Sequence, residues 1–119
     1  MKISIITTTL NSEKTLAYTL SSVFEQTYKK IEHIIVDGGS TDETLDIIKR
    51  HKVKNKKFFY YKNSSIYEAI NLGIKKSTGD YVLILNSDDI LEESNTIEKV
   101  TKFIQNKKKN NYFRFSNLL

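Results

Sequence analysis

The spacing of apolar residues changes several times along the chain, and each change marks a boundary between predicted elements. Short runs rich in β-branched and aromatic residues predict strands, whereas apolar residues three or four positions apart predict helices. The runs that predict strands lie at residues 3–8, 33–37, 58–61 and 81–85. The first run is β-branched at every position except Ser4, which predicts a strand buried on both faces. Residues 112–115 are a candidate fifth strand.

Helical spacing follows each of these four segments. The apolar residues that carry it are Leu16, Leu20, Val23 and Phe24, then Leu45 and Ile48, then Ile66, Ala69, Ile70 and Ile74, and last Ile97, Val100 and Ile104. Helix starts are predicted from side chains that cap backbone N–H groups. These are Asn11 and Ser12 for the first helix, Ser40 with Glu43 for the second, and Ser65 with Glu68 for the third. Gly79 is predicted to occupy the position just past the end of the third helix, where glycine is common.

Strands that alternate with helices of this length predict right-handed crossovers and a mainly parallel sheet with flanking helices, which is an α/β fold. The 119 residues allow one domain, 1–119. All strands of a parallel sheet end at one edge, and ligands bind at that edge in open α/β sheets. Polar residues cluster after each predicted strand, at residues 8–11, 37–40, 62–65 and 86–89, so we expect a ligand site there.

The composition excludes several kinds of site. Cysteine is absent, which excludes disulfides, thiolate zinc sites and cysteine nucleophiles, and two histidines argue against a multi-histidine metal site. The sequence has no run of about 20 apolar residues that would span a membrane. The first residues do not resemble a signal peptide. We therefore expect a cytoplasmic protein.

The net charge is +5, and the cations are unevenly distributed. Six lysine and arginine residues lie between residues 49 and 57, and Lys107 to Lys109 form a second cluster. One interpretation is a surface that attracts phosphates, nucleic acid or anionic lipid headgroups. The other interpretation, which we favour here, is a solvated helix end and loop, where lysine also complements the helix dipole.

Asp88 and Asp89 directly follow the predicted strand 81–85, which we expect to be buried. Two adjacent carboxylates at a strand tip suit a hard divalent cation that completes its shell with phosphate oxygens and water. Such a cation acts as a Lewis acid on a departing diphosphate. The alternative is a polar turn in which one of the aspartates caps the next helix.

Asp37 ends the second predicted strand and is followed by a glycine pair. Its carboxylate can accept hydrogen bonds from a nucleobase or ribose, and the helix start at Ser40 can hold an anion. An ordinary turn, in which Asp37 bonds nearby amides, is the alternative. Neither the G-x-G-x-x-G fingerprint nor a Walker-type phosphate loop occurs in the sequence. Asn71 and Gly73 are unfavourable inside a helix, which indicates a packing or ligand requirement.

Taken together, three ordered segments resemble family 2 glycosyltransferases of the GT-A fold. The segments are residues 3–11, 35–42 and 79–89, and residues 66–73 resemble the subgroup that builds bacterial O-antigen and capsule polysaccharides. The resemblance implies a Rossmann-like nucleotide-binding half. It also implies inverting transfer from a nucleotide-diphosphate sugar to a glycan or lipid-linked acceptor, assisted by Mg²⁺ or Mn²⁺. With such an acceptor, the protein would be peripheral to the cytoplasmic face of the inner membrane.

The same resemblance implies roles for individual residues. The residues implied for nucleotide-sugar binding are Thr9, Asn11, Asp37, Ser40, Asn71 and Asp88, and the implied metal ligand is Asp89. Thr9 and Asn11 would line the nucleotide cleft. Asp37 would contact the base, with Ser40 close to it, and Asp88 would lie near the ribose and phosphates.

The chain departs from the family in sequence and in length. Thr8 stands where the family often has proline, and Asn86 where many members have aspartate. Asn63 and Ser65 replace an aspartate and a glycine. Family members are typically much longer, and their second half supplies the acceptor site and the catalytic base. We therefore expect the general base beyond residue 119 and little or no transfer by this chain alone.

An unfinished surface is also expected. The candidate strand 112–115 would leave an open edge that favours self-association or binding of a complementing acceptor-domain chain. Residues 106–119 are expected to include a poorly ordered tail. The alternative function is a non-catalytic nucleotide-sugar-binding module or a partner subunit of a complete transferase. A basic nucleic-acid-binding protein is a third hypothesis, although the resemblance implies no nucleic-acid partner.

Overall fold

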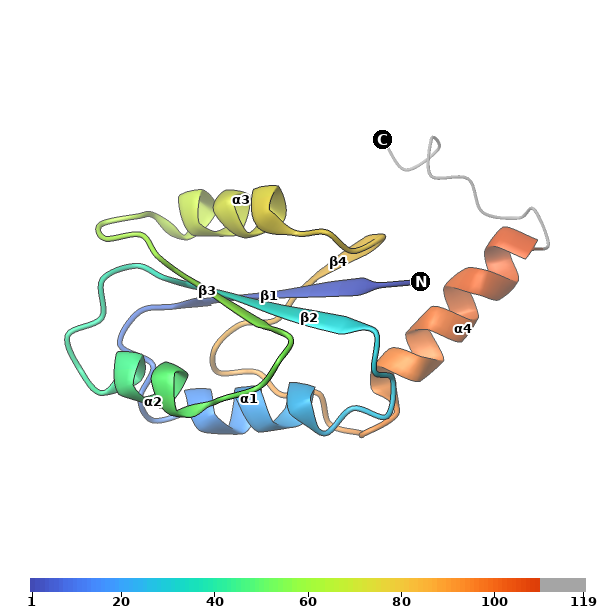
Figure 1. Cartoon of the computed structure of the whole chain (residues 1–119), viewed down its shortest axis with the longest axis horizontal. Helices are drawn as coiled ribbons and strands as arrows, with labels where there is room; N and C mark the ends of the chain where they lie inside the picture. The colour runs from blue at the N-terminus through green and yellow to red at the C-terminus, as the bar shows by residue number, and fades with distance from the viewer. Residues whose placement is uncertain (110–119) are drawn as a thin grey trace.

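A computed structural model describes residues 1–109, and residues 110–119, with the candidate fifth strand, lie outside the described part. Strands and helices alternate as predicted (Figure 1). In chain order they are β1 (Ile3–Thr9), α1 (Leu16–Phe24), β2 (Ile31–Asp37), α2 (Thr44–Arg50), β3 (Lys56–Tyr60), α3 (Ile66–Lys76), β4 (Tyr81–Ile84) and α4 (Thr96–Lys109). Among these helices, none has the length and apolar character needed to cross a bilayer.

The four strands form one sheet in the order β3-β2-β1-β4, and every neighbouring pair is parallel. Helix α3 covers one face of the sheet, and α1 and α2 cover the other (Figure 1). The carboxyl ends of β1, β2 and β3 lie at the left of Figure 1, while the N-terminus and α4 lie at the right. The predicted α/β fold with a mainly parallel sheet is confirmed.

The two central strands, β1 and β2, supply most of the core. Their side chains alternate between the two faces of the sheet. Toward α3 they present Ile6, Ile34 and Val36, which pack against Ala69. Toward α1 and α2, Ile35 packs into a second cluster. The prediction that the first strand is buried on both faces is confirmed, because helices cover it from both sides.

Strand β4 lies at the edge of the sheet and is largely exposed. Val82, Leu83 and Ile84 are 41%, 36% and 46% exposed. The expectation of a buried fourth strand is therefore wrong. β4 pairs with β1 alone, and within residues 1–109 no strand lies along its other side. An apolar composition does not bury a strand that other elements leave uncovered.

The predicted starts of the first two helices are wrong. Helix α1 begins at Leu16, whose N–H bonds the carbonyl of Ser12 rather than its side chain. Helix α2 begins at Thr44, after the predicted start. The Ser40 hydroxyl donates to Asp37 and makes no cap for that helix. In both cases the polar side chain that was predicted to cap the helix forms a hydrogen bond with another residue instead.

Helix α3 begins with the predicted capping box, but it packs on the sheet through small residues. Ala69 and Gly73 are buried, whereas Ile66 and Ile74 are 56% and 45% exposed. Ile66 and Ile74, which share the helical spacing of Ala69, therefore do not belong to the buried face of the helix. A Cβ atom at Gly73 would lie 2.6 Å from Cγ2 of Ile6, so close packing against β1 requires the glycine.

Gly79 does not terminate α3. The helix ends at Lys76, and Ser77 is its C-cap residue. A Cβ atom at Gly79 would lie 2.8 Å from the backbone nitrogen of Ser4. The glycine therefore allows the chain to approach β1 closely as it enters β4, which corrects the predicted capping role.

Candidate functional site

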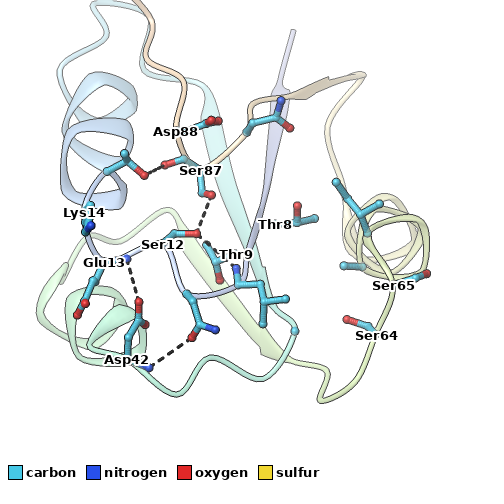
Figure 2. Close-up of a pocket in the computed structure, with 17 residues that line it drawn as sticks. Thr8, Thr9, Ser12, Glu13, Lys14, Asp42, Ser64, Ser65, Ser87 and Asp88 are labelled. Atoms are coloured by element: carbon cyan, nitrogen blue, oxygen red, sulfur yellow. Dashed lines mark hydrogen bonds between the residues drawn. The ribbon is translucent and has the colours of Figure 1, made fainter.

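Polar residues that follow β1, β3 and β4 line a cleft at the carboxyl edge of the sheet (Figure 2). Its volume is about 680 Å³, which lies in the usual range for small-molecule sites. The β1–α1 connection forms one wall, the start of α3 a second, and the segment from Asn86 to Asp88 a third. The cleft therefore lies at the edge where the sequence predicts a ligand site.

Asn11 shapes the first wall. Its backbone is left-handed, with φ of 52°, a conformation that asparagine tolerates better than most residues. Its Oδ1 accepts the N–H of Thr41 at 2.8 Å, and its own N–H donates to Ser40 Oγ at 2.8 Å. Asn11 thereby ties the β1–α1 connection to the β2–α2 connection beside the cleft.

Asp37 is completely buried at the end of β2, and each of its oxygens accepts two hydrogen bonds. Oδ1 accepts from Thr9 Oγ1 at 2.7 Å and from Ser40 Oγ at 2.6 Å. Oδ2 accepts from the N–H groups of Gly39 at 2.9 Å and Ser40 at 2.8 Å. The carboxylate therefore joins the ends of β1 and β2 and holds the turn that leads to α2.

Two threonines of the α1 region hold the turn that follows β4. Thr15 Oγ1 and Thr19 Oγ1 lie 2.8 and 2.9 Å from the carbonyl oxygen of Ser87 (Figure 2 shows the first of these bonds). Thr19 Oγ1 also lies 2.6 Å from the carbonyl oxygen of Asp89. Because Thr19 is completely buried, its hydroxyl fixes the segment that carries Asp88 and Asp89 against α1.

Charged side chains of both signs border the cleft, namely Glu13, Lys14, Asp42 and Asp88. Glu13 Oε2 accepts the N–H of Glu43 at 3.1 Å. Burial would raise the pKa of Asp42, but hydrogen bonds from the Thr44 hydroxyl and N–H outweigh it and lower the pKa. These two carboxylates are thus engaged by the protein, and Lys14 provides a cation for an anionic ligand.

The acidic residues suit a metal ion that is shared with a ligand. Within residues 1–109, no group of three or more histidine, cysteine, aspartate and glutamate residues is placed to hold a metal. Asp88 and Asp89 are adjacent and exposed. Mg²⁺ typically binds one or two carboxylates and completes its shell with phosphates and water. The aspartate pair fits an ion of this kind, not a cage made by the protein alone.

The predicted site residues divide into three groups. Thr9, Asn11 and Asp88 line the cleft, whereas Asp37 and Ser40 are buried behind its wall. Asn71 and Asp89 are exposed and lie outside the lining of the cleft. Sequence reasoning missed Lys14 and Ser64. The Ser64 hydroxyl is buried in the cleft wall and has no hydrogen-bond partner among the described residues. The polar cluster at residues 62–65 is a sequence signal for it.

The cleft and the parallel sheet agree with the comparison of this chain with known proteins. Residues 4–115 match the profile of Glycosyl transferase family 2. The chain belongs to this family. One curated relative is a PGL/p-HBAD biosynthesis glycosyltransferase from Mycobacterium bovis, 38% identical over 104 residues. Another is an uncharacterized glycosyltransferase from Haemophilus influenzae, 36% identical over 107 residues. The matches cover 85% and 87% of this chain but 41% and 43% of the relatives, so the chain spans about two fifths of their length.

Solved structures share the fold. The structure of S. aureus TarS 1-349 matches with a TM-score of 0.84 and 31% identity, over 91% of this chain and 33% of that chain. TarS has been solved in complex with UDP and with UDP-GlcNAc. A second fold match is the mannosyltransferase PcManGT from Pyrobaculum calidifontis, solved in complex with GDP-Man and Mn²⁺. Its TM-score is 0.79 at 23% identity, over 85% of this chain and 31% of that chain. The expected GT-A, Rossmann-like fold is confirmed.

Proposed function

We propose that the cleft binds a nucleotide-diphosphate sugar and that the chain is the donor-binding part of an inverting glycosyltransferase. The observation that carries this proposal is a cleft of about 680 Å³ at the carboxyl edge, with the unpartnered Ser64 hydroxyl in its wall. Support comes from TarS, which is 31–32% identical and has been solved with UDP and UDP-GlcNAc.

We assign the cleft residues as follows. Thr9 and Asn11 lie beside the nucleotide, and Asn71 is a further candidate on α3. Asp37 acts on the base through Thr9 and Ser40, because the protein already occupies both of its oxygens. This assignment replaces a direct contact between Asp37 and the base with an indirect one.

Asp88 and Asp89 form the proposed metal and diphosphate side of the cleft. Asp88 lies near the ribose and phosphates, and Asp89 holds Mg²⁺ or Mn²⁺. The ion supplies Lewis-acid stabilisation of the departing diphosphate. Thr15 and Thr19 orient this pair through the carbonyl groups of the turn.

Inverting transfer also needs a base that removes the proton of the acceptor hydroxyl. Glu13, Asp42 and Glu68 lie in or near the cleft, and each accepts hydrogen bonds from neighbouring backbone or hydroxyl groups. We therefore propose that the base and the acceptor site lie outside residues 1–119. The chain alone should transfer sugar slowly or not at all, because loss of a general base typically costs about 10²–10⁴-fold in rate.

The proposed acceptor is a growing polysaccharide or a lipid-linked glycan, handled at the cytoplasmic face of the membrane. The exposed edge of β4 offers a surface for the acceptor part, since Val82, Leu83 and Ile84 are apolar and exposed there. A complementing chain or a second copy of this chain would cover that edge.

Titration calorimetry with a panel of nucleoside diphosphates, with and without Mn²⁺, tests the assignment. Asp89→Ala should abolish the metal-dependent part of the affinity, because it removes the proposed metal ligand. Asp46→Ala, at an exposed aspartate on α2, is the matched control and should keep that part. Unchanged metal dependence in Asp89→Ala would refute the metal assignment, and absence of nucleotide binding by the chain would refute the function.

A further inference from the structure

A group of exposed cations lies at the edge of the sheet opposite the cleft. The connections α1–β2, residues 25–30, and α2–β3, residues 51–55, run at this edge, where β2 and β3 begin. Exposed cations lie on these connections and on the last turn of α2, and we name them the basic edge. Its members are Lys29, Lys30, Lys49, Arg50, Lys52 and Lys54.

Asn55 joins the two connections. Its side-chain amide donates to the carbonyl of Ile31 at 2.9 Å, and its own carbonyl accepts the N–H of His33 at 2.8 Å. Beside this junction Phe24, the last residue of α1, is 59% exposed. Its ring lies 6.2 Å from the ring of His51, which begins the second connection. An exposed aromatic ring is therefore held next to the basic edge.

The positive charge of the basic edge is not neutralised by the protein. None of its six cations lies within 4.0 Å of a carboxylate in residues 1–109. The carboxylates near it in sequence are Glu25 and Asp46, which are exposed, and Glu32, which is buried. Glu32 already pairs with Lys57 at 2.6 Å and with Lys2 at 3.5 Å. The charge is therefore available to an anionic partner.

We propose that the basic edge and Phe24 bind the surface of a bilayer that contains anionic phospholipids. Each lysine or arginine near such a surface strengthens binding roughly fivefold. Aromatic rings beside cations are typical of protein surfaces that lie at the headgroup level. Single-stranded nucleic acid is instead bound by several aromatic rings among the cations. Neither connection carries an exposed aromatic residue of its own.

This surface also specifies an orientation. Strands β1 and β2 are seven residues long, so the start of β2, which Lys29 and Lys30 precede, lies about 23 Å from the edge that carries the cleft. A chain bound through the basic edge would hold its cleft away from the lipid, open to a soluble nucleotide sugar. The inference rests on the proposed membrane location but is independent of sugar transfer.

Cosedimentation of the 119-residue chain with vesicles tests the surface. Vesicles of phosphatidylcholine mixed with phosphatidylglycerol should bind it, vesicles of phosphatidylcholine alone should bind it far less, and added salt should weaken binding. Lys52→Gln with Lys54→Gln should weaken binding roughly 10- to 30-fold. The control, Lys99→Gln with Lys102→Gln, removes equal charge from α4, where both lysines pair with glutamates. Equal losses in the two variants would overturn the proposal.

A fluorescent probe tests the orientation. The chain contains no tryptophan, so Phe24→Trp introduces a single one, and its emission should shift to the blue on anionic vesicles. Tyr67→Trp replaces an exposed residue of α3, where the helix begins beside the cleft, and should show no shift. No shift for Phe24→Trp, or equal shifts for both, would overturn the proposal, as would tighter binding to RNA than to the vesicles. Calorimetry with UDP on the same variants tests the cleft separately, because it does not depend on lipid.

Discussion

Replacing Asp37 with asparagine tests whether this buried carboxylate holds the carboxyl edge of the sheet together. Its four hydrogen bonds come from Thr9, Gly39 and Ser40 and are 2.6–2.9 Å long. The asparagine oxygen can keep two of them, but its NH₂ group then faces two donors that must reorient. Bonds to a charged acceptor contribute about 1.5–3 kcal/mol each, and neutral bonds about 0.5–1.5 kcal/mol. A neutral amide is also easier to bury, so we expect Asp37→Asn to lower the free energy of unfolding by about 2–4 kcal/mol.

Urea unfolding followed by circular dichroism at neutral pH measures this loss. Asp46→Asn, at an exposed aspartate of α2, is the matched control and should change the free energy of unfolding by less than about 0.5 kcal/mol. Nucleotide affinity is measured for both variants in the absence of urea, where they remain folded. If Asp37→Asn unfolds like the wild type but no longer binds nucleoside diphosphate, then Asp37 contacts the ligand directly and the structural role is refuted.

Three other contacts give further expected outcomes. Thr19→Val removes the buried hydroxyl that holds the Asp89 carbonyl. It should lower the free energy of unfolding by about 1–3 kcal/mol and weaken Mn²⁺-dependent nucleotide binding, and Thr19→Ser should restore both. Calorimetry that finds unchanged metal dependence in Thr19→Val would contradict this. Burial, with the nearby charge of His51, lowers the pKa of His33 from 6.5 to about 3, so the unfolded chain binds a proton that the folded chain does not. Stability should therefore be complete above pH 6.5 and fall by about 2 kcal/mol at pH 5, and His33→Gln should flatten this dependence in urea unfolding series; equal slopes would show that His33 is not the cause. The exposed β4 edge should make the chain self-associate, and Leu83→Lys should shift it toward monomer in size-exclusion chromatography with light scattering; a monomeric wild type would contradict this.

The sequence alone determined the order of elements, the parallel sheet and the edge at which the cleft lies. These features depend on local patterns, because β-branched runs form strands and apolar residues at helical spacing form helices. The helical crossovers make the strands parallel, and parallel strands bring all their carboxyl ends to one edge. For this reason Asn11 and Asp88, far apart in the sequence, were expected at one site, and both line the cleft.

Only the tertiary structure decided which polar groups remain free for a ligand. Asp37 and Asp88 both lie at the carboxyl ends of predicted strands, yet Asp37 is buried with both oxygens occupied and Asp88 is exposed. The donors to Asp37 include Thr9 of the neighbouring strand, and no local pattern in the sequence specifies that contact. The exposure of β4 and the burial of Gly73 were likewise decided by packing. An apolar strand is buried only where other elements cover it, and Gly73 is needed because α3 lies directly on Ile6.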